Sequence, residues 1–395
     1  MNNNFFTKEN DRYGSGSSKW DLFEANGYPQ DTIPMWVADM DFPTVPEVIA
    51  EIEKLARTGI WGYTYASDAY YQAVVNWQKT RHNHLIKKED ISIMPGVVTA
   101  INVAIEAFTD VGDYVLIQEP VYHPFRIQIE NLGRQAISAD LIENQGQYKM
   151  DLATLEEMIV KHNIKLMLFC NPHNPVGRVY TRDELIDLSE ILLKYNVLVV
   201  SDEIHGDLIL PGYKHIPYAT LSSETANQCI TCTAPSKTFN LAGLTTSNII
   251  IENTELKERF DRVAQKRALP ALSPFGLKAC ETAYNCGAYW LDQLRTFIAS
   301  QYQISKIFVE TNQLPIKITP LEGTYLMWLD FRALTNNPDS IEAAGKNVGL
   351  WLNNGKIFGD SGRGFMRLNL ACTEKTLNQG LVKITKMVEE LAKTK

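Results

Sequence analysis

The stretch CITCTAPSKTFNLAG, residues 229–243, decides the fold. Its first five residues are apolar or β-branched and end in a turn, which is typical of a buried strand. Lys237 comes within a few residues of the end of this strand. A lone lysine after a strand is usually a solvated surface residue, so its meaning depends on the residues at the ends of the neighbouring strands.

Five short apolar runs predict buried strands: DYVLIQ (113–118), KLMLFC (165–170), VLVVSD (197–202), CITCT (229–233) and NIIIE (248–252). Amphipathic stretches at 151–161 and 181–194 lie between them, and Thr181 with Glu184 predicts a capping box. Strands that alternate with helices indicate parallel βαβ units, buried on both faces. The fold class is therefore α/β, with a mostly parallel sheet.

The pattern changes after about residue 286. A long helical stretch at 288–311 leads to two strand candidates, TYLMWLDF (324–331) and GFMRLNL (364–370), and a helix from about 373 closes the chain. We expect a large domain at 46–286. A smaller α+β domain is expected from 1–45 together with 287–395.

Composition narrows the class of protein. The chain has 395 residues, 45% of them hydrophobic, and a formal net charge of −8, which argues against a nucleic-acid or anionic-membrane surface. The N-terminus lacks the features of a signal peptide, and no apolar stretch is long enough for a bilayer, so a cytoplasmic protein is expected. Cys229 and Cys232 lie in a predicted strand and are expected to be buried. RHNH (81–84) is interpreted as a solvated corner, and no metal site is expected.

Three polar segments come directly after predicted strands: NPHNPVG (171–177), SDEIHGD (201–207) and APSKTFNLAG (234–243). Parallel sheets bind ligands beyond the carboxyl ends of their strands, so Asn174, Asp202 and Lys237 are expected together. An amine, a carboxylate and an amide are what pyridoxal 5'-phosphate requires for its covalent link, its ring nitrogen and its phenolate oxygen. Asp202 alone could equally be a helix N-cap, but the combination is much more specific than any member.

These segments resemble the cofactor motifs of fold-type I pyridoxal-phosphate enzymes, the aminotransferase class I/II superfamily. Further strings resemble the MalY/PatB-type cystathionine β-lyases, also called C–S lyases: MWVADMDFP (35–43), GYTY (62–65), PGVVTA (95–100), PVYHPF (120–125) and GFMRLN (364–369). The resemblance runs from about residue 19 to the end. It implies an aspartate-aminotransferase-like fold whose large domain has a mostly parallel seven-stranded sheet.

The resemblance also implies a role for each cofactor-binding residue. Lys237 binds the cofactor and moves the substrate Cα proton. Asp202 pairs with the ring nitrogen, Asn174 donates to the phenolate oxygen, and Tyr122 stacks on the ring. His205 stands where many aminotransferases carry a tyrosine, so it either assists Asn174 or packs beside it.

The phosphate and substrate groups are implied in the same way. The amides of Val97 and Val98 would open a helix at the phosphate, and Ser236 would add a hydroxyl. Tyr63 would reach the phosphate of a neighbouring subunit, which implies a homodimer with shared sites. The substrate carboxylate would meet Arg367 and the Ala38 amide, with Asn174 nearby.

Structural alternatives remain for several of these residues. Tyr122 could be a core aromatic, Val97 and Val98 could merely start a helix, and Arg367 could be a surface strand residue. Ala234 and Thr245 also depart from the family pattern, because serine and a basic residue are common there. The stretch NNGKIFGDSGRG (353–364) is shorter than in close relatives, which leaves one edge of the substrate cavity undefined.

The reaction that the resemblance implies is α,β-elimination from L-cystathionine, L-cysteine or a related S-conjugate, giving a thiol, pyruvate and ammonia. An aminotransferase would use the same residues, because both reactions share a carbanion at Cα. A pyridoxal-phosphate-binding protein with a regulatory role is a third hypothesis.

Overall fold

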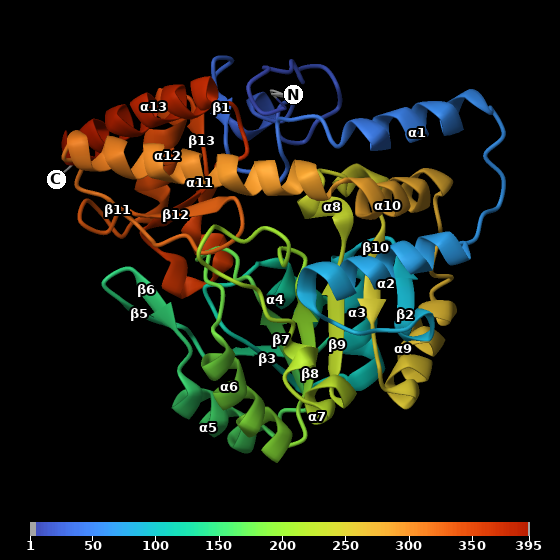
Figure 1. Ribbon diagram of the computed structural model, residues 1–395. Coiled ribbons are helices and arrows are strands. Elements are labelled where there is room, and N and C mark those ends of the chain that lie inside the picture. Colours follow the sequence, from blue (N-terminus) through green and yellow to red (C-terminus); the bar gives the residue numbers. More distant parts are fainter. Residues whose placement is uncertain (1–4, 394–395) are drawn as a thin grey trace.

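A seven-stranded sheet lies at the centre of the molecule, whose computed structural model describes residues 5–393 (Figure 1). In spatial order its strands are β2 (Ile91–Met94), β10 (Ser247–Ile250), β9 (Cys229–Thr233), β8 (Leu198–Asp202), β7 (Leu166–Cys170), β3 (Tyr114–Ile117) and β4 (Gln135–Ser138). β10 is antiparallel to both of its neighbours, and the pairs from β9 to β4 are parallel. The predicted α/β class and the mostly parallel sheet are confirmed.

Helices cover both faces of this sheet. Alternate residues of a strand point to opposite faces, so Leu166 and Leu168 of β7 join one core while Met167 and Phe169 join the other. The first core includes α3 (Val97–Phe108), α4 (Pro124–Asn131) and α9 (Thr254–Lys266). The second includes α5 (Leu152–His162) and α6 (Arg182–Lys194), with α7 (Ser223–Asn227) at its margin. Burial on both faces explains the continuous apolar runs.

A smaller sheet lies apart from the large one, beside the C-terminal helices at the upper left of Figure 1. It is antiparallel, and its strands in order are β11 (Lys317–Ile318), β12 (Leu326–Asp330), β15 (Phe365–Asn369) and β14 (Asn353–Asn354). The helices beside it are α11 (Ala288–Thr311), α12 (Pro338–Val348) and α13 (Glu374–Lys393). The N-terminal strand β1 (Ile33–Pro34) pairs with β13 (Leu350–Trp351), which joins the N-terminal segment to the C-terminal part of the chain.

Three further helices lie at the edge of the molecule opposite the small sheet (Figure 1). They are α1 (Pro46–Arg57), α2 (Asp68–His82) and α10 (Pro274–Cys286), and α10 packs against the other two. Residues 58–67 join α1 to α2 without helix or strand. A hairpin of β5 (Ile142–Asn144) and β6 (Gln147–Lys149) and the short helix α8 (Pro235–Thr238) complete these elements.

The capping box predicted for α6 is confirmed. Thr181 Oγ1 accepts from the Glu184 N–H at 3.3 Å, and the Glu184 carboxylate accepts from the Thr181 N–H at 2.8 Å. Each side chain therefore satisfies a backbone donor that a helix start leaves unpaired.

The interpretation of RHNH as a solvated corner is wrong for its two histidines, although Asn83 is exposed. His82 Nε2 lies 2.9 Å from Asp207 Oδ1, and His84 Nε2 lies 3.0 Å from Glu252 Oε1; the side chain of His84 is buried and that of His82 is 9% exposed. Both histidines therefore have a carboxylate partner within the protein. Cys229 and Cys232 are buried as expected. Within residues 5–393 there is no cluster suited to a metal ion, and no helix long and apolar enough to cross a membrane.

Candidate active site

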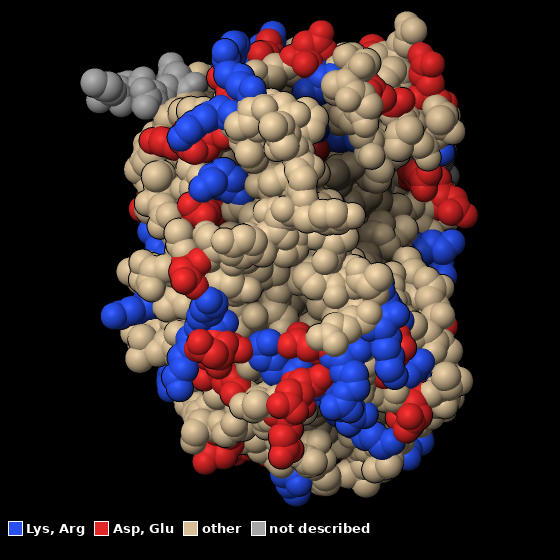
Figure 2. Space-filling view, turned by 90° about the vertical axis from the view of Figure 1, so that its right-hand side faces the viewer, with Lys and Arg blue, Asp and Glu red and all other residues tan. Residues whose placement is uncertain are grey.

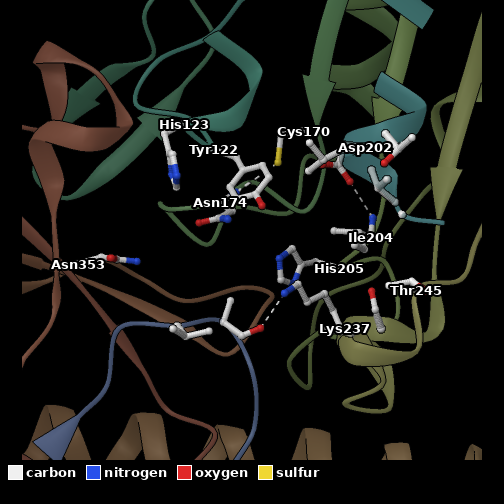
Figure 3. A pocket seen from close by; sticks show the side chains of 18 of the residues that line it. Tyr122, His123, Cys170, Asn174, Asp202, Ile204, His205, Lys237, Thr245 and Asn353 are labelled. Atoms are coloured by element: carbon white, nitrogen blue, oxygen red, sulfur yellow. Dashed lines mark hydrogen bonds between the residues drawn. The ribbon is translucent and has the colours of Figure 1, made fainter. Parts of the chain in front are cut away.

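A cavity of about 410 Å³ lies beyond the carboxyl ends of β7, β8 and β9. This volume is in the range of small-molecule sites. Its lining includes every predicted site residue except Tyr63: Ala38, Val97, Val98, Tyr122, Asn174, Asp202, His205, Ser236, Lys237 and Arg367. Tyr122, Asn174, Asp202, His205 and Lys237 gather around one open space in Figure 3.

Lys237 enters the cavity from α8. Its Nζ donates to the Ala38 carbonyl at 2.7 Å. Burial, with the nearby positive charge of Arg367, lowers the pKa of Lys237 to about 8. The next residue, Thr238, is fully buried and donates from Oγ1 to Asp207 Oδ2 at 2.8 Å. A useful fraction of Lys237 therefore carries a neutral amine near neutral pH.

Asp202 ends β8 at the edge of the cavity. Its Oδ1 accepts from the Ile204 N–H at 3.1 Å. Burial raises the pKa of Asp202 to about 7. Within residues 5–393 no side chain donates a hydrogen bond to this carboxylate. A buried carboxylate in this state can accept a cationic N–H from a ligand.

Arg367 points into the cavity from β15, so the alternative of a surface strand residue is excluded: its exposed fraction is 4%. Its Nη1 donates to Asn174 Oδ1 and its Nη2 to the Trp36 carbonyl, both at 2.9 Å, while the buried Nε has no partner among the described residues. Burial lowers the pKa of Arg367 to about 10, which still leaves it charged. Its guanidinium also lies 4.9 Å from the centre of the Phe358 ring.

Hydrogen bonds from Asn369 of β15 and from Tyr325 hold the segment 36–39 at the cavity. Asn369 lies two residues after Arg367 and donates from Nδ2 to the carbonyls of Val37 and Asp39, each at 2.6 Å. The Tyr325 hydroxyl donates to the Ala38 carbonyl at 2.9 Å. These bonds occupy the carbonyl of Ala38 and hold its backbone at the cavity.

The wall formed by α3 presents backbone amides. The helix starts at Val97 after Gly96, which offers no side chain to cap it, so the first N–H groups remain available to an anion. Val97, Val98 and Ser236 all line the cavity. Tyr122 lines it too, and burial raises the pKa of its phenol to about 12, which keeps the hydroxyl protonated.

His205 is buried beside the cavity with its ring 6.0 Å from that of Tyr325. Burial and the nearby cations Lys237 and Arg367 hold its pKa well below the ordinary value. The imidazole is therefore neutral at physiological pH. Its Nδ1 is buried without a partner in the described part of the chain.

Sequence reasoning missed several residues that line the cavity: Trp36, Cys170, Ile204, Thr246, Asn353 and Ile357, with His123 beside them. His123 and Trp36 lie inside the quoted motifs PVYHPF and MWVADMDFP, which was the available signal. Asn353 donates from Nδ2 to the Trp36 carbonyl at 2.9 Å. Asn353 begins the stretch 353–364 that the sequence linked to an edge of the cavity, but its approach to Trp36 depends on packing between distant segments.

Comparison with known proteins shows the family. A family model described as aminotransferase class I and II matches residues 30–384. The chain belongs to this family. The chain is 41% identical to "Cystathionine beta-lyase PatB" of Bacillus subtilis. The alignment covers 96% of this chain and 98% of PatB. The predicted MalY/PatB-type relationship is confirmed.

Solved structures of other family members have the same fold. Cystalysin from Treponema denticola, whose crystal structure contains a pyridoxal 5'-phosphate cofactor, matches with a TM-score of 0.94 and 40% identity over 98% of this chain and 99% of its own. A pyridoxal-phosphate-bound putative aminotransferase from Clostridium difficile matches with a TM-score of 0.94 and 39% identity over 97% and 99%. The aspartate-aminotransferase-like fold is confirmed.

Proposed function

We propose that the chain is a pyridoxal-phosphate-dependent carbon–sulfur β-lyase that acts on L-cystathionine and related S-conjugates of cysteine. The observation that carries the proposal is the convergence of Lys237, Asp202 and Arg367 on one cavity. It occurs in a chain that is 41% identical to a protein named cystathionine β-lyase.

The residues present fit the cofactor. Asp202 is buried with a single backbone donor, and a protonated ring nitrogen is the cationic N–H that would complete it. The uncapped amides at Val97 and Val98, with Ser236, suit a phosphate. Tyr122 would stack on the ring, and Asn174 would donate to the phenolate oxygen, with His205 packed neutral beside it.

When bound, pyridoxal phosphate supplies an electron sink for a carbanion at the substrate Cα. Lys237 would hold the cofactor, and its free amine would take the Cα proton. A pKa of about 8 suits that base, because it holds a useful neutral fraction near pH 7. Departure of the β-thiolate completes the elimination, and water releases pyruvate and ammonia.

Arg367 orients the substrate. Its charged guanidinium, with the Ala38 amide and Asn174, would hold the α-carboxylate. Asn174 Oδ1 already accepts from Arg367, which fixes the direction of the guanidinium. Binding of the carboxylate in this way would direct the substrate Cα–H bond toward Lys237. Such positioning of the reacting bond is how a protein contributes to this chemistry.

An aminotransferase is the second candidate. The 39% identical Clostridium difficile relative carries that description, and the same residues serve both reactions. The two differ in whether Cβ expels its substituent or the cofactor carbon is reprotonated. Lyase names among relatives that are 41% and 31% identical favour elimination.

We also propose a homodimer. The segment 58–67, here called the arm, exposes Ile60, Trp61, Tyr63 and Tyr65 by 83%, 57%, 112% and 82%. Figure 2 views the edge of the molecule where the arm lies, and a broad band there lacks charged residues. An exposed aromatic segment of this kind is typical of an interface. Tyr63 does not line the cavity of its own chain, so it is free to contact the cofactor site of a second subunit.

The test is the release of pyruvate and free thiol from L-cystathionine by pyridoxal-phosphate-loaded protein, measured with and without a 2-oxo acid. The proposal predicts repeated turnover of both products without the 2-oxo acid. Turnover that requires the 2-oxo acid would replace the lyase with the aminotransferase.

A further inference from the structure

A second cavity adjoins the active site and is here called the outer cavity. Its volume is about 630 Å³. Tyr122, His123 and Ile357 line both cavities, so the two spaces share one wall. The remaining lining comes from α4, Glu119, Val121 and residues 356–360. The last of these belong to the stretch 353–364, where the sequence left the edge of the substrate cavity undefined.

His123 stands where the two cavities meet. Figure 3 shows its imidazole pointing into the space beside Tyr122, across from Asn353. Its ring centre lies 6.0 Å from that of Phe358, the ring on which the Arg367 guanidinium packs at 4.9 Å. One aromatic ring therefore separates His123 from the residue proposed to hold the substrate carboxylate.

The imidazole of His123 is a neutral hydrogen-bonding group. Burial, with the positive charge of Arg367, lowers its pKa to about 4. Its Nδ1 is buried without a partner in the part of the chain that is described. A buried polar atom of this kind is normally satisfied, so a ligand or ordered water is expected there.

The wall of the outer cavity carries charges of both signs, and most of them are already paired. Arg126 donates to Glu119 at 2.8 Å and to Glu130 at 3.3 Å. Asp360 is paired with Arg363 at 3.0 Å. Lys356 has no ion pair among residues 5–393, so its ammonium is free to meet an anion.

The outer cavity adjoins the active-site cavity at Tyr122, His123 and Ile357. With the α-carboxylate at Arg367, a long substituent on Cβ would reach this boundary. A purely apolar substituent would desolvate the charged wall without compensating it. A substituent that ends in a carboxylate would instead find the ammonium of Lys356, unpaired within residues 5–393, and the imidazole of His123.

We infer that the outer cavity binds the distal amino-acid end of a dipolar thioether substrate, with Lys356 at the distal carboxylate and His123 hydrogen-bonded to the same end. The inference rests on the proposed lyase function. It makes the chain selective for thioethers of the L-cystathionine class over S-alkyl cysteines of the same length.

The experiment compares L-cystathionine with S-propyl-L-cysteine, which has the same chain but lacks the distal ammonium and carboxylate. In Lys356→Gln and in His123→Phe, the ratio of kcat/KM for the two substrates is expected to fall roughly three- to tenfold toward the S-propyl compound. Lys356→Arg should restore the ratio. The matched control is Lys386→Gln, a lysine of α13 far along the chain from the outer cavity, which should leave the ratio unchanged. A ratio that stays constant in both outer-cavity variants would overturn the inference.

A binding measurement separates this inference from the lyase proposal. L,L-diaminosuberate has a methylene in place of the sulfur of L-cystathionine, so it cannot expel a thiolate, and L-α-aminoheptanoate is its counterpart without the distal groups. Titration of the cofactor absorption band should give tighter binding of diaminosuberate, and Lys356→Gln should remove the difference. Equal affinities in the native chain contradict the subsite. Selective binding without pyruvate release would retain the subsite and reject the lyase.

Discussion

Asp202 combines burial with the lack of a cationic partner among the described side chains, and this makes a prediction about stability as well as activity. Its pKa is raised from 3.8 to about 7, so across that interval the folded chain holds a proton that the unfolded chain has released. Stability of the cofactor-free chain therefore falls as pH rises through this window. We therefore compare the free energy of unfolding of Asp202→Asn with that of the native chain, both without cofactor. The difference, variant minus native, should be about 2 kcal/mol more favourable to the variant at pH 8 than at pH 5.

Denaturant unfolding of the cofactor-free chain at both pH values measures this difference. The same variant should lose roughly two to four orders of magnitude in kcat, because the ring nitrogen loses its anionic partner. The role given to this carboxylate would be contradicted if Asp202→Asn gained no stability relative to the native chain between pH 5 and pH 8, or if it kept its activity.

Arg367 makes a second prediction at the scale of single residues. Arg367→Lys should raise KM roughly 10- to 100-fold, since an ammonium cannot reproduce the two-pronged contact or the bond to Asn174. Steady-state kinetics on L-cystathionine measures the effect, with the exposed Arg182→Lys as the matched control. An unchanged KM would mean that the carboxylate binds elsewhere.

At the scale of elements, a hydrogen bond from Thr238 to Asp207 holds α8, the helix that carries Lys237, in place. Thr238 Oγ1 donates to Asp207, which also accepts from Trp77 Nε1 at 3.0 Å and lies 2.9 Å from His82 Nε2. Thr238→Val removes one donor while nearly preserving shape, and it should destabilise the chain by about 1–3 kcal/mol. Thr238→Ser keeps the donor and should cost clearly less. Denaturant melts of the pair test this, and equal losses would mean that packing rather than the hydrogen bond matters.

The sequence predicted those elements whose local pattern reflects their burial. β7 and β8 were predicted because burial on both faces produces continuous apolar runs. β2 and β4, the two edge strands, were not predicted: β4 is half exposed, and β2, although buried, has the sequence ISIM, in which a serine interrupts the apolar run. The antiparallel direction of β10 was also missed. The link from β9 contains only α8 and a single 3-10 turn at Ala242–Leu244, with no helix that crosses the sheet, so the chain returns from the same edge.

The same reasoning explains which site residues could be found. Asn174, Asp202 and Lys237 come after strands of one parallel sheet, and such a sheet gathers them at one edge. His123 and Asn353 lie in stretches that the sequence singled out, PVYHPF and 353–364, but their place at the cavity depends on packing between distant segments and could not be assigned residue by residue. Arg367 was assigned by resemblance, and only the structure shows that it is buried rather than exposed.

At the scale of the whole molecule, the arm makes the fourth prediction. If it lies in a dimer interface, Ile60→Asp combined with Tyr65→Asp should shift the chain from dimer to monomer, because charge is costly in a buried interface. Sedimentation velocity measures the change, and Ile307→Asp, at an exposed position of α11, is the control. A native chain that sediments as a monomer would contradict the proposed dimer and the role of Tyr63. The division into domains at 45 and 286 stays a prediction.

Lys237 is proposed to move the Cα proton in a carbon–sulfur lyase, and every other role assigned to the cavity depends on that step. Steady-state pyruvate release from L-cystathionine should be measured for the native chain and for Lys237→Ala, both saturated with pyridoxal phosphate and without any 2-oxo acid. We predict many turnovers per site for the native chain and a rate lower by roughly 10²- to 10⁴-fold or more in the variant. A variant within tenfold of the native rate, or a native chain that releases no pyruvate, would contradict the proposed role of Lys237.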